Sequence, residues 1–455
     1  MKPETAKETK PLWIWLMSGC VLLLLVAVLM PSAETKQTTG PAPSAKTATT
    51  ANGSAAAGRL AATHARKTTA PRTAQEIVAA KLRQFGVQRR ALVHTLAERR
   101  KIDVLPEVER FFDALESGDW EETRRLFKSL KDERDGPSGS DLRKYFRAVL
   151  EAYGAAEQVR LWPPQQLLDY GNGVLDSLRP GMVYIGGTDP GCFIPTMLNE
   201  TTQGEQHLTL TQNALADASY LDYLTSIYGD SLNVPTQEES QAAFNQYIAD
   251  ATIRAQHDEQ FPDEPKQVLP GENITTVDGH ASVSGQVAVM AINNILTQTL
   301  LQKNPDLSFA MEESFSMPSS YAGAAPLGPV FELRAGDTMT SDQAAQSVNY
   351  WQNEAQNLQA AGETSTTVLQ SYSHDADSQG NLLANNNYPA QAGQAYQTAL
   401  SIFPGSVEAI TGLTRVLAQQ GQFDQAGQAL DTFLQNNPQQ GQTVGNLRQT
   451  WLVNH

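Results

Sequence analysis

The sequence predicts an α/β fold, a mixed or parallel sheet with flanking helices, set between two helical regions and preceded by one transmembrane helix. Three observations carry this prediction. A run of 19 residues without a charge, Leu12 to Met30, lies near the N-terminus. Short apolar runs alternate with helical stretches from Gly181 onward, and a 34-residue repeat appears near the C-terminus. The 455-residue length suits two folded domains beside linker and anchor.

Composition excludes several classes of function. The chain has 33 basic and 49 acidic residues and a net charge of -16, which argues against a nucleic-acid partner, because phosphate backbones require a basic surface. Cys20 and Cys192 are the two cysteines, so neither a disulfide framework nor a cysteine metal site is expected. We predict no cofactor and no metal.

The run from Leu12 to Met30 predicts a membrane anchor, since 19 helical residues span about 28 Å, one bilayer core. Lysines precede it and tryptophans mark its entry: Lys2, Lys7, Lys10, Trp13 and Trp15. We therefore expect residues 1–11 to form a cytoplasmic tail and the bulk of the chain to be extracytoplasmic, that is, periplasmic.

Two alternatives to an uncleaved anchor stay open. One is a signal peptide cleaved near Ser32-Ala33, which would place Pro31 at the third position before the cut. The other is a lipoprotein signal ending at Cys20, which leaves a short apolar run before the cysteine and a long one after it. The position of Pro31 and the unequal apolar runs around Cys20 both favour an uncleaved anchor.

Residues 31–72 are predicted to form a disordered Ala/Thr-rich linker. Of the 38 residues from Ala33 to Ala70, 28 are Ala, Thr, Ser, Gly or Pro, too few large apolar side chains to form a core. Residues 73–177 then show apolar residues at helical spacing among dense mixed charges, which predicts a helical region. Within it, Ser117-Gly118-Asp119 divides a helical hairpin.

Residues 178–335 are predicted to form the α/β domain. Four strands are expected at Met182–Ile185, His207–Leu210, Leu307–Met311 and Val330–Leu333. Asp278-Gly279 predicts a hairpin between two further apolar stretches. Helices are expected at Ala218–Tyr228, Gln241–Gln256 and Val287–Gln302, and one more from Cys192 or Phe193.

Residues 336–455 contain the 34-residue repeat. Ala392, Tyr396, Ala399 and Pro404 map onto Ala426, Leu430, Phe433 and Pro438. These resemble the small, large and proline positions of a tetratricopeptide repeat, in which small residues let antiparallel helices approach each other. We predict a tetratricopeptide-like helical unit, capped by a helix at Leu447–Leu452, that binds a protein partner.

The segments RPGMVYIGGTDPGCFIPTMLNE, HLTLTQNALADASYLDYL and NPDLSFAMEESF resemble the extracytoplasmic α/β domain of protein-mannosyltransferase-like glycosyltransferase membrane proteins. They also resemble uncharacterised bacterial membrane-anchored tetratricopeptide-repeat proteins with a GGTDPG segment. That pattern has a basic residue where this chain has Cys192, which argues against an anionic ligand. The transferases carry their catalytic carboxylates between several membrane helices, so the resemblance implies no transferase chemistry for a chain with one such helix.

Polar clusters follow three of the predicted strands, where open α/β sheets bind ligands. The candidate ligand-binding residues are Gly186, Gly187, Thr188, Asp189, Gln212, Asn213, Glu312 and Glu313. The turn could hold an anion or a sugar hydroxyl through its backbone N–H groups. The competing interpretation makes Asp189 a helix N-cap and leaves one glutamate of the pair in solvent.

No residue pattern names a reaction. The seven histidines show no HExxH spacing, and GxSxG is absent from the sequence; we predict no catalytic residue. The leading hypothesis is a non-catalytic, membrane-tethered scaffold of the bacterial cell envelope that binds a protein. The alternative is an envelope glycan-binding or glycosyltransferase-associated α/β domain with its site at the carboxyl ends of the strands.

Overall fold

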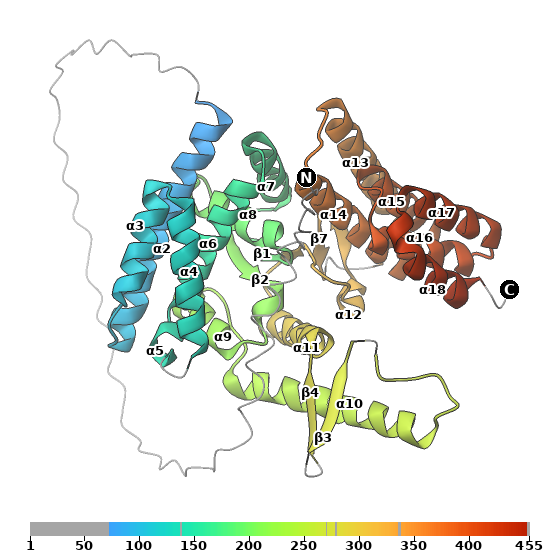
Figure 1. The fold of residues 1–455 in the computed structure, drawn as a ribbon, viewed down its shortest axis with the longest axis horizontal. Coiled ribbons are helices and arrows are strands. Elements are labelled where there is room, and N and C mark those ends of the chain that lie inside the picture. Colours follow the sequence, from blue (N-terminus) through green and yellow to red (C-terminus); the bar gives the residue numbers. More distant parts are fainter. Residues whose placement is uncertain (1–71, 137–138, 270, 278–279, 335–337, 453–455) are drawn as a thin grey trace, which may run out of the picture.

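The computed structural model describes residues 72–455 except 137–138, 270, 278–279, 335–337 and 453–455. The described chain is mostly helical, with one small mixed sheet in its middle. Figure 1 shows this sheet between the N-terminal helices and the C-terminal helical unit. The predicted mixed sheet with flanking helices is therefore found, but helix predominates in the described chain, because each strand of the main sheet has only three or four residues.

The N-terminal region is helical, as predicted. It consists of α2 (Ala74–Arg100), α3 (Pro106–Ser117), α4 (Trp120–Asp135), α5 (Ser140–Arg143), α6 (Phe146–Leu161) and α7 (Pro164–Ser177). The predicted break between α3 and α4 is confirmed. Gly118 has a φ of 80°, a left-handed conformation that glycine adopts without strain, and the Asp119 side chain caps α4 by accepting a hydrogen bond from the Glu122 N–H.

The main sheet has the strand order β2-β1-β5-β7-β6. Its strands are β1 (Val183–Gly186), β2 (Leu208–Thr211), β5 (Phe309–Met311), β6 (Ala325–Leu327) and β7 (Val330–Leu333). β1 pairs in parallel with β2 and β5, while β7 runs antiparallel to β5 and to β6. The three strands expected to lie side by side in parallel therefore do so. β6 was not predicted, because three residues containing a proline carry no strand pattern.

Alternate residues of β1 enter different cores, although the whole strand is buried. Val183 and Ile185 pack in the large core that reaches α3, α4 and α6, whereas Tyr184 packs with Met182 and Val174 on the opposite face. Helices on both faces therefore exclude water from the sheet, which explains why the strand reads as a continuous apolar run.

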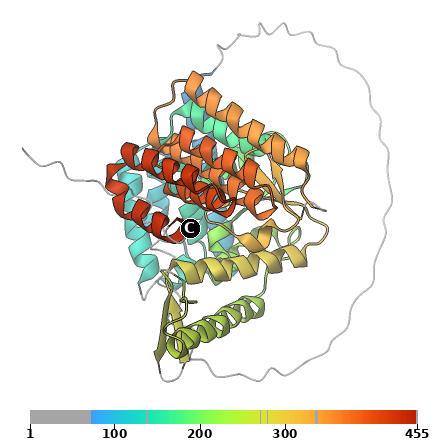
Figure 2. The same ribbon diagram turned by 90° about the vertical axis from the view of Figure 1, so that its right-hand side faces the viewer.

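Helices and a hairpin connect the strands. These elements are α8 (Asp189–Glu200), η3 (Gln212–Ala214), α9 (Ala218–Tyr228), α10 (Gln237–Gln260), α11 (Gln286–Lys303) and α12 (Pro318–Tyr321), with the strands β3 (Asn273–Val277) and β4 (His280–Ser284). β3 and β4 pair antiparallel, which confirms the predicted hairpin. Figures 1 and 2 show the hairpin and α10 at one end of the molecule, away from the main sheet.

The C-terminal unit is a succession of antiparallel helices: α13 (Ser341–Ala360), α14 (Thr366–Asn385), α15 (Pro389–Ile402), α16 (Val407–Gln419), α17 (Phe423–Asn436), η4 (Pro438–Gln440) and α18 (Gly441–Trp451). The repeat positions on α15 and α17 are all buried. The ring of Tyr396 lies against Gly380 on α14 and Gly412 on α16, where an added Cβ would come within 2.5 Å of the ring. Small residues thus let three helices meet around one tyrosine.

The predicted membrane segment, cytoplasmic tail and linker lie outside the described residues. Over the part of the chain that the structure describes, no helix combines the length and the apolar character needed to cross a bilayer.

Candidate functional site

The turn between β1 and α8 brings the predicted glycine-rich segment to the carboxyl end of the sheet. Thr188 has extended dihedral angles, and its hydroxyl accepts a hydrogen bond from the Gly191 N–H at 3.1 Å. Thr188 is therefore the N-cap of α8, and the prediction that Asp189 caps this helix is wrong. Asp189 is the first helical residue, so α8 begins three residues before the predicted start at Cys192. Pro190 fits in the first turn, because backbone N–H groups there have no hydrogen-bond partner within the helix and the one that proline lacks is not needed.

The anion-binding groups of this turn are occupied by the protein's own Glu312. The N–H groups of Gly187 and Thr188 donate to Glu312 Oε2 at 2.6 and 2.9 Å, and the Thr188 hydroxyl donates to Oε1 at 2.7 Å. Glu312 is 2% exposed. The backbone can hold a carboxylate, as the glycine-rich sequence indicates, but the carboxylate comes from the end of β5 instead of from a ligand.

Two glycines of the turn are required by the close approach of β5. A Cβ on Gly187 would lie 2.2 Å from the Ser314 backbone nitrogen and 2.6 Å from the Glu312 carbonyl oxygen. A Cβ on Gly191 would lie 1.9 Å from Glu312 Oε2. The glycines are therefore needed because the end of β5 packs tightly against the turn between β1 and α8.

The second predicted cluster, Gln212 and Asn213, lies at the same edge of the sheet, and the Gln212 side chain points into the protein interior. Gln212 is fully buried, and its side-chain oxygen accepts hydrogen bonds from the N–H and the hydroxyl of Ser314 at 2.8 and 3.1 Å. The Asn213 side-chain oxygen accepts from the same hydroxyl at 3.3 Å. The ends of β1, β2 and β5 thus converge as predicted, largely through contacts with one another.

Glu313 points away from Glu312 and is 1% exposed. Its carboxyl accepts a hydrogen bond from the Tyr321 hydroxyl at 2.7 Å and a longer one from the Met317 N–H at 3.4 Å. Burial raises the pKa of Glu313 to about 8. The expectation that one glutamate of this pair faces solvent is wrong, because Tyr321 of α12 binds the Glu313 carboxyl and the turn between β1 and α8 binds the Glu312 carboxyl.

Sequence reasoning missed Asp375, a buried carboxyl on α14 beside Glu312. Burial, and next the negative charge of Glu312, raise the pKa of Asp375 well above its usual range. The same two causes raise the pKa of Asp189 to about 6. The available signal was the pair Asp375 and Asp377 in the middle of a helix that is buried on most sides, where unpaired carboxylates are rarely found.

A cleft of about 120 Å³ opens outside the turn. Of the candidate residues it is lined by Gly187, Asp189 and Asn213; Gly186, Thr188, Gln212, Glu312 and Glu313 do not line it. Its other walls carry aromatic and basic side chains, among them Phe127, Phe146, Phe193, Lys131, Arg134 and Arg147. The cleft therefore combines apolar ring surfaces with one carboxyl, two amides and several cations.

Arg147 is fixed at the floor of this cleft. Its Nε lies 3.0 Å from Glu151 Oε1, and its guanidinium carbon lies 4.6 Å from the centre of the Tyr220 ring. Cys192 also lines the cleft. Burial raises the pKa of its thiol, which donates to the Gly186 carbonyl oxygen at 3.0 Å. A protonated, hydrogen-bonded thiol is a poor nucleophile.

No metal centre is found within the described ranges, where no group of three or more His, Cys, Asp and Glu side chains is placed to hold an ion. Two histidines near the end of the sheet contact backbone carbonyl oxygens. His207 Nδ1 lies 3.0 Å from the Met182 carbonyl oxygen just before β2, and His374 Nε2 lies 2.7 Å from the Glu313 carbonyl oxygen.

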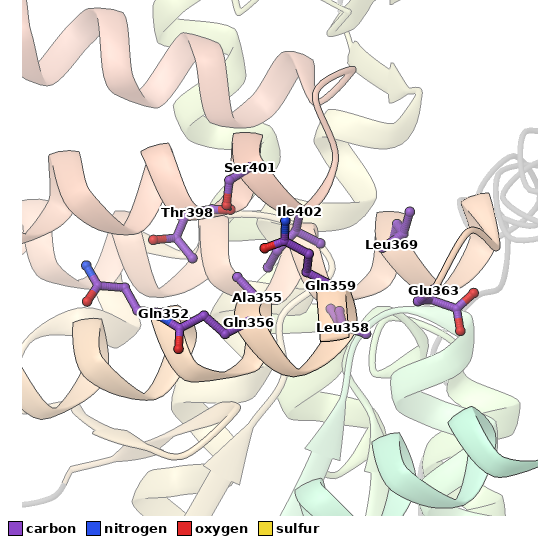
Figure 3. A pocket seen from close by; sticks show the side chains of 10 residues that line it. All are labelled: Gln352, Ala355, Gln356, Leu358, Gln359, Glu363, Leu369, Thr398, Ser401 and Ile402. Atoms are coloured by element: carbon purple, nitrogen blue, oxygen red, sulfur yellow. The ribbon is translucent and has the colours of Figure 1, made fainter. Parts of the chain in front are cut away.

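A second, larger groove runs along the C-terminal unit and has a volume of about 500 Å³. Figure 3 shows Gln352, Gln356 and Gln359 projecting from α13 toward Thr398 and Ser401 on α15. Its polar lining is mostly uncharged, with Glu363 at one end. Such a surface offers amide and hydroxyl groups that can hydrogen-bond to a polypeptide backbone.

Comparison with known proteins identifies this C-terminal region. A family model described as tetratricopeptide repeat matches residues 382–449, which run from the end of α14 into α18. The predicted repeat is confirmed. No curated protein and no solved structure matches the chain significantly. The C-terminal unit therefore contains a tetratricopeptide-like array, an architecture that commonly mediates protein–protein interaction.

Proposed function

We propose that this protein is a membrane-tethered, extracytoplasmic scaffold of the bacterial cell envelope that binds a protein partner through its tetratricopeptide-like unit. The observation that carries the proposal is the repeat match at residues 382–449 together with the polar groove between α13 and α15. The groove has a volume of about 500 Å³, and Glu363 is the charged residue in its lining.

The location rests on the N-terminal sequence. The uncharged run from Leu12 to Met30 fits one bilayer crossing, and the Ala/Thr-rich segment after it fits a flexible tether. The GGTDPG segment and its surroundings resemble the extracytoplasmic domains of membrane proteins. This resemblance supports an extracytoplasmic location for the bulk of the chain.

Crosslinking in cells tests the groove. A photoreactive amino acid at Gln356, in the groove, is expected to give a discrete crosslinked product, whereas the same group at Gln428, exposed on α17, is not. Thr398→Arg, which fills the groove with a long charged side chain, should reduce the product at Gln356 at least tenfold. Equal crosslinking from both positions would contradict a partner in the groove.

Topology is tested separately. A reporter enzyme that is active only outside the cytoplasm, fused after His455, is expected to be active, and the protein should stay with membranes after a high-salt wash. An inactive reporter, or release of the protein by salt, would refute the tether and leave the groove unaffected.

A glycan-binding role is the second candidate, favoured by the cleft beside the turn. Sugars combine apolar ring faces with hydroxyl groups, which suits walls of phenylalanine next to Asp189, Asn213 and Arg147. We expect Asp189→Asn to weaken binding of an N-acetylglucosamine tetramer at least fivefold in a calorimetric titration, while Asp342→Asn, on exposed α13 surface, has no effect. A tetramer that shows no saturable binding to the parent chain would rule this role out.

A further inference from the structure

The cleft outside the turn between β1 and α8 has a basic wall. Three cations line it, Lys131 and Arg134 on α4 and Arg147 on α6, against one carboxyl, that of Asp189 at the start of α8. Phe127, Lys131 and Arg134 occupy positions i, i+4 and i+7 of α4, which place their side chains on one face of the helix. The cations therefore come from two helices that pack together, whereas the carboxyl belongs to a different element.

The protein's own carboxylates neutralise these cations to different degrees. Arg147 is matched by Glu151, whose Oε1 lies 3.0 Å from Arg147 Nε. Arg134 donates to the carboxylate of its neighbour Asp135, which is exposed, and ion pairs with an exposed partner contribute little because water screens them. Lys131 forms no ion pair with another residue of the described ranges. Lys131 and Arg134 therefore leave positive charge available to a ligand.

Contacts with aromatic rings hold the two arginines in place. The guanidinium carbon of Arg134 lies 4.6 Å from the centre of the Phe146 ring, and that of Arg147 lies 4.6 Å from the centre of the Tyr220 ring. A guanidinium placed over a ring keeps N–H groups at its edge, and it loses little conformational freedom when it binds a carboxylate or a phosphate. The side chains of Arg134 and Arg147 are 16% and 15% exposed, so both retain surface that a ligand can contact.

Neutral polar groups supply another part of the lining. Asn213 and Gln286 carry amides that can donate to and accept from hydroxyl groups. The backbone N–H groups of Gly187 and Thr188 already donate to Glu312, so a ligand anion has to be held by the side chains of α4 and α6. A ligand that uses both parts of the cleft carries hydroxyl or amide groups and one negative group.

We propose that this cleft binds an acidic sugar, with its negative group on Lys131 and Arg134 and its hydroxyl groups on Asn213 and Asp189. The inference rests on the glycan-binding role and narrows it to sugars that carry a carboxylate or a phosphate. Like charge keeps the negative group away from Asp189, which fixes the direction in which the ligand lies. A neutral sugar makes no ionic contact with α4 and therefore binds more weakly.

Calorimetric titration of the full chain, in micelles of a detergent without a sugar headgroup, tests the proposal. The probes are N-acetylglucosamine 1-phosphate and N-acetylmuramic acid, and N-acetylglucosamine is the neutral control with the same ring. We expect at least one acidic sugar to bind at least tenfold more tightly than the neutral one. High salt should remove most of this difference, because salt screens partly exposed charges. The comparison of the two acidic probes distinguishes a phosphate from a carboxylate as the negative group.

Three outcomes would overturn the proposal. Saturable binding of the N-acetylglucosamine tetramer, without any preference for acidic sugars, would leave the glycan-binding role standing and refute the acidic ligand. Inorganic phosphate or acetate that bound as tightly as the acidic sugars would mean that the cleft holds an anion without recognising a sugar. Absence of binding by every sugar would refute both the glycan-binding role and this inference.

Variants assign the preference to the basic wall. The double variant Lys131→Gln, Arg134→Gln should weaken binding of the acidic sugar at least tenfold and leave the affinity for the neutral tetramer within twofold. A merely structural role of these residues would change both affinities together. Lys128→Gln is the matched control, because Lys128 is exposed on the same helix and does not line the cleft; it should change neither affinity. Undiminished binding of the acidic sugar by a folded double variant would overturn the assignment.

Discussion

Gly187→Ala is expected to lower the free energy of unfolding by about 3 kcal/mol or more. The new methyl group would meet two backbone atoms, the Ser314 nitrogen at 2.2 Å and the Glu312 carbonyl oxygen at 2.6 Å, and backbone atoms cannot move aside as a flexible side chain can. Overpacking alone costs about 1–3 kcal/mol and occasionally more. Separating the turn from β5 would also weaken the hydrogen bonds to the Glu312 carboxylate, leaving buried polar groups unpaired.

Denaturant unfolding followed by circular dichroism measures this effect. Gly427→Ala on α17 is the matched control, because no atom lies within 4 Å of its added Cβ; this variant should be as stable as the parent or about 0.5–1 kcal/mol more stable. Equal stability of Gly187→Ala and the parent would mean that β5 does not pack against the turn as described.

The stability of the protein is expected to fall as the pH rises from 5 to 8, with Glu313 as a main cause. The pKa of Glu313 is about 8 in the folded protein because its carboxyl is buried, against about 4.3 in an unfolded chain. A carboxyl with a raised pKa favours the folded state fully below the unfolded value, and this contribution is lost as the pH rises toward the folded value. Each unit of difference corresponds to about 1.4 kcal/mol.

Glu313→Gln is expected to remove this dependence. Between pH 5 and 8 the variant should lose about 2–4 kcal/mol less of its unfolding free energy than the parent chain, as measured by denaturant unfolding at each pH. Some decline remains, because burial also raises the pKa of Asp377 and of Glu157 to about 7. Glu98→Gln, on an exposed helix surface, is the control. A variant whose pH dependence matched the parent's would show that Glu313 titrates as an exposed carboxyl does.

These expectations change the role given to Glu312. From the sequence, its position after a core strand fits a ligand-binding carboxylate or a harmless surface residue. The structure makes it the partner of the Gly187 and Thr188 N–H groups. Sequence reasoning identified an anion-binding turn and a nearby carboxylate as separate features. The turn and the carboxylate are 125 residues apart along the chain. A contact between such distant residues produces no periodic pattern in the sequence.

Local patterns determined the elements of the fold. Helical spacing of apolar residues predicted Ala218–Tyr228 to the residue, and the Asp278-Gly279 turn predicted the hairpin of β3 and β4. The 34-residue offset predicted α15 and α17 as the equivalent helices of two successive repeats. Each signal depends on residues close in sequence, because backbone hydrogen bonds and turn conformations are set by near neighbours. The carboxyl ends of three parallel strands were likewise expected at one edge, since right-handed connections leave few other arrangements.

The sequence by itself thus determined most of the segments that are helix, strand, hairpin and repeat, with β6 as an exception, and it predicted the edge of the sheet where polar residues meet. Only the tertiary structure decided what those residues face. Packing turned Gln212 and Glu312 inward, left Asp189 and Asn213 at the cleft, and brought the basic side chains of α4 and α6 to the same cleft. The physical reason is that side-chain environment depends on contacts between distant segments, which burial of apolar surface selects and which no local spacing encodes.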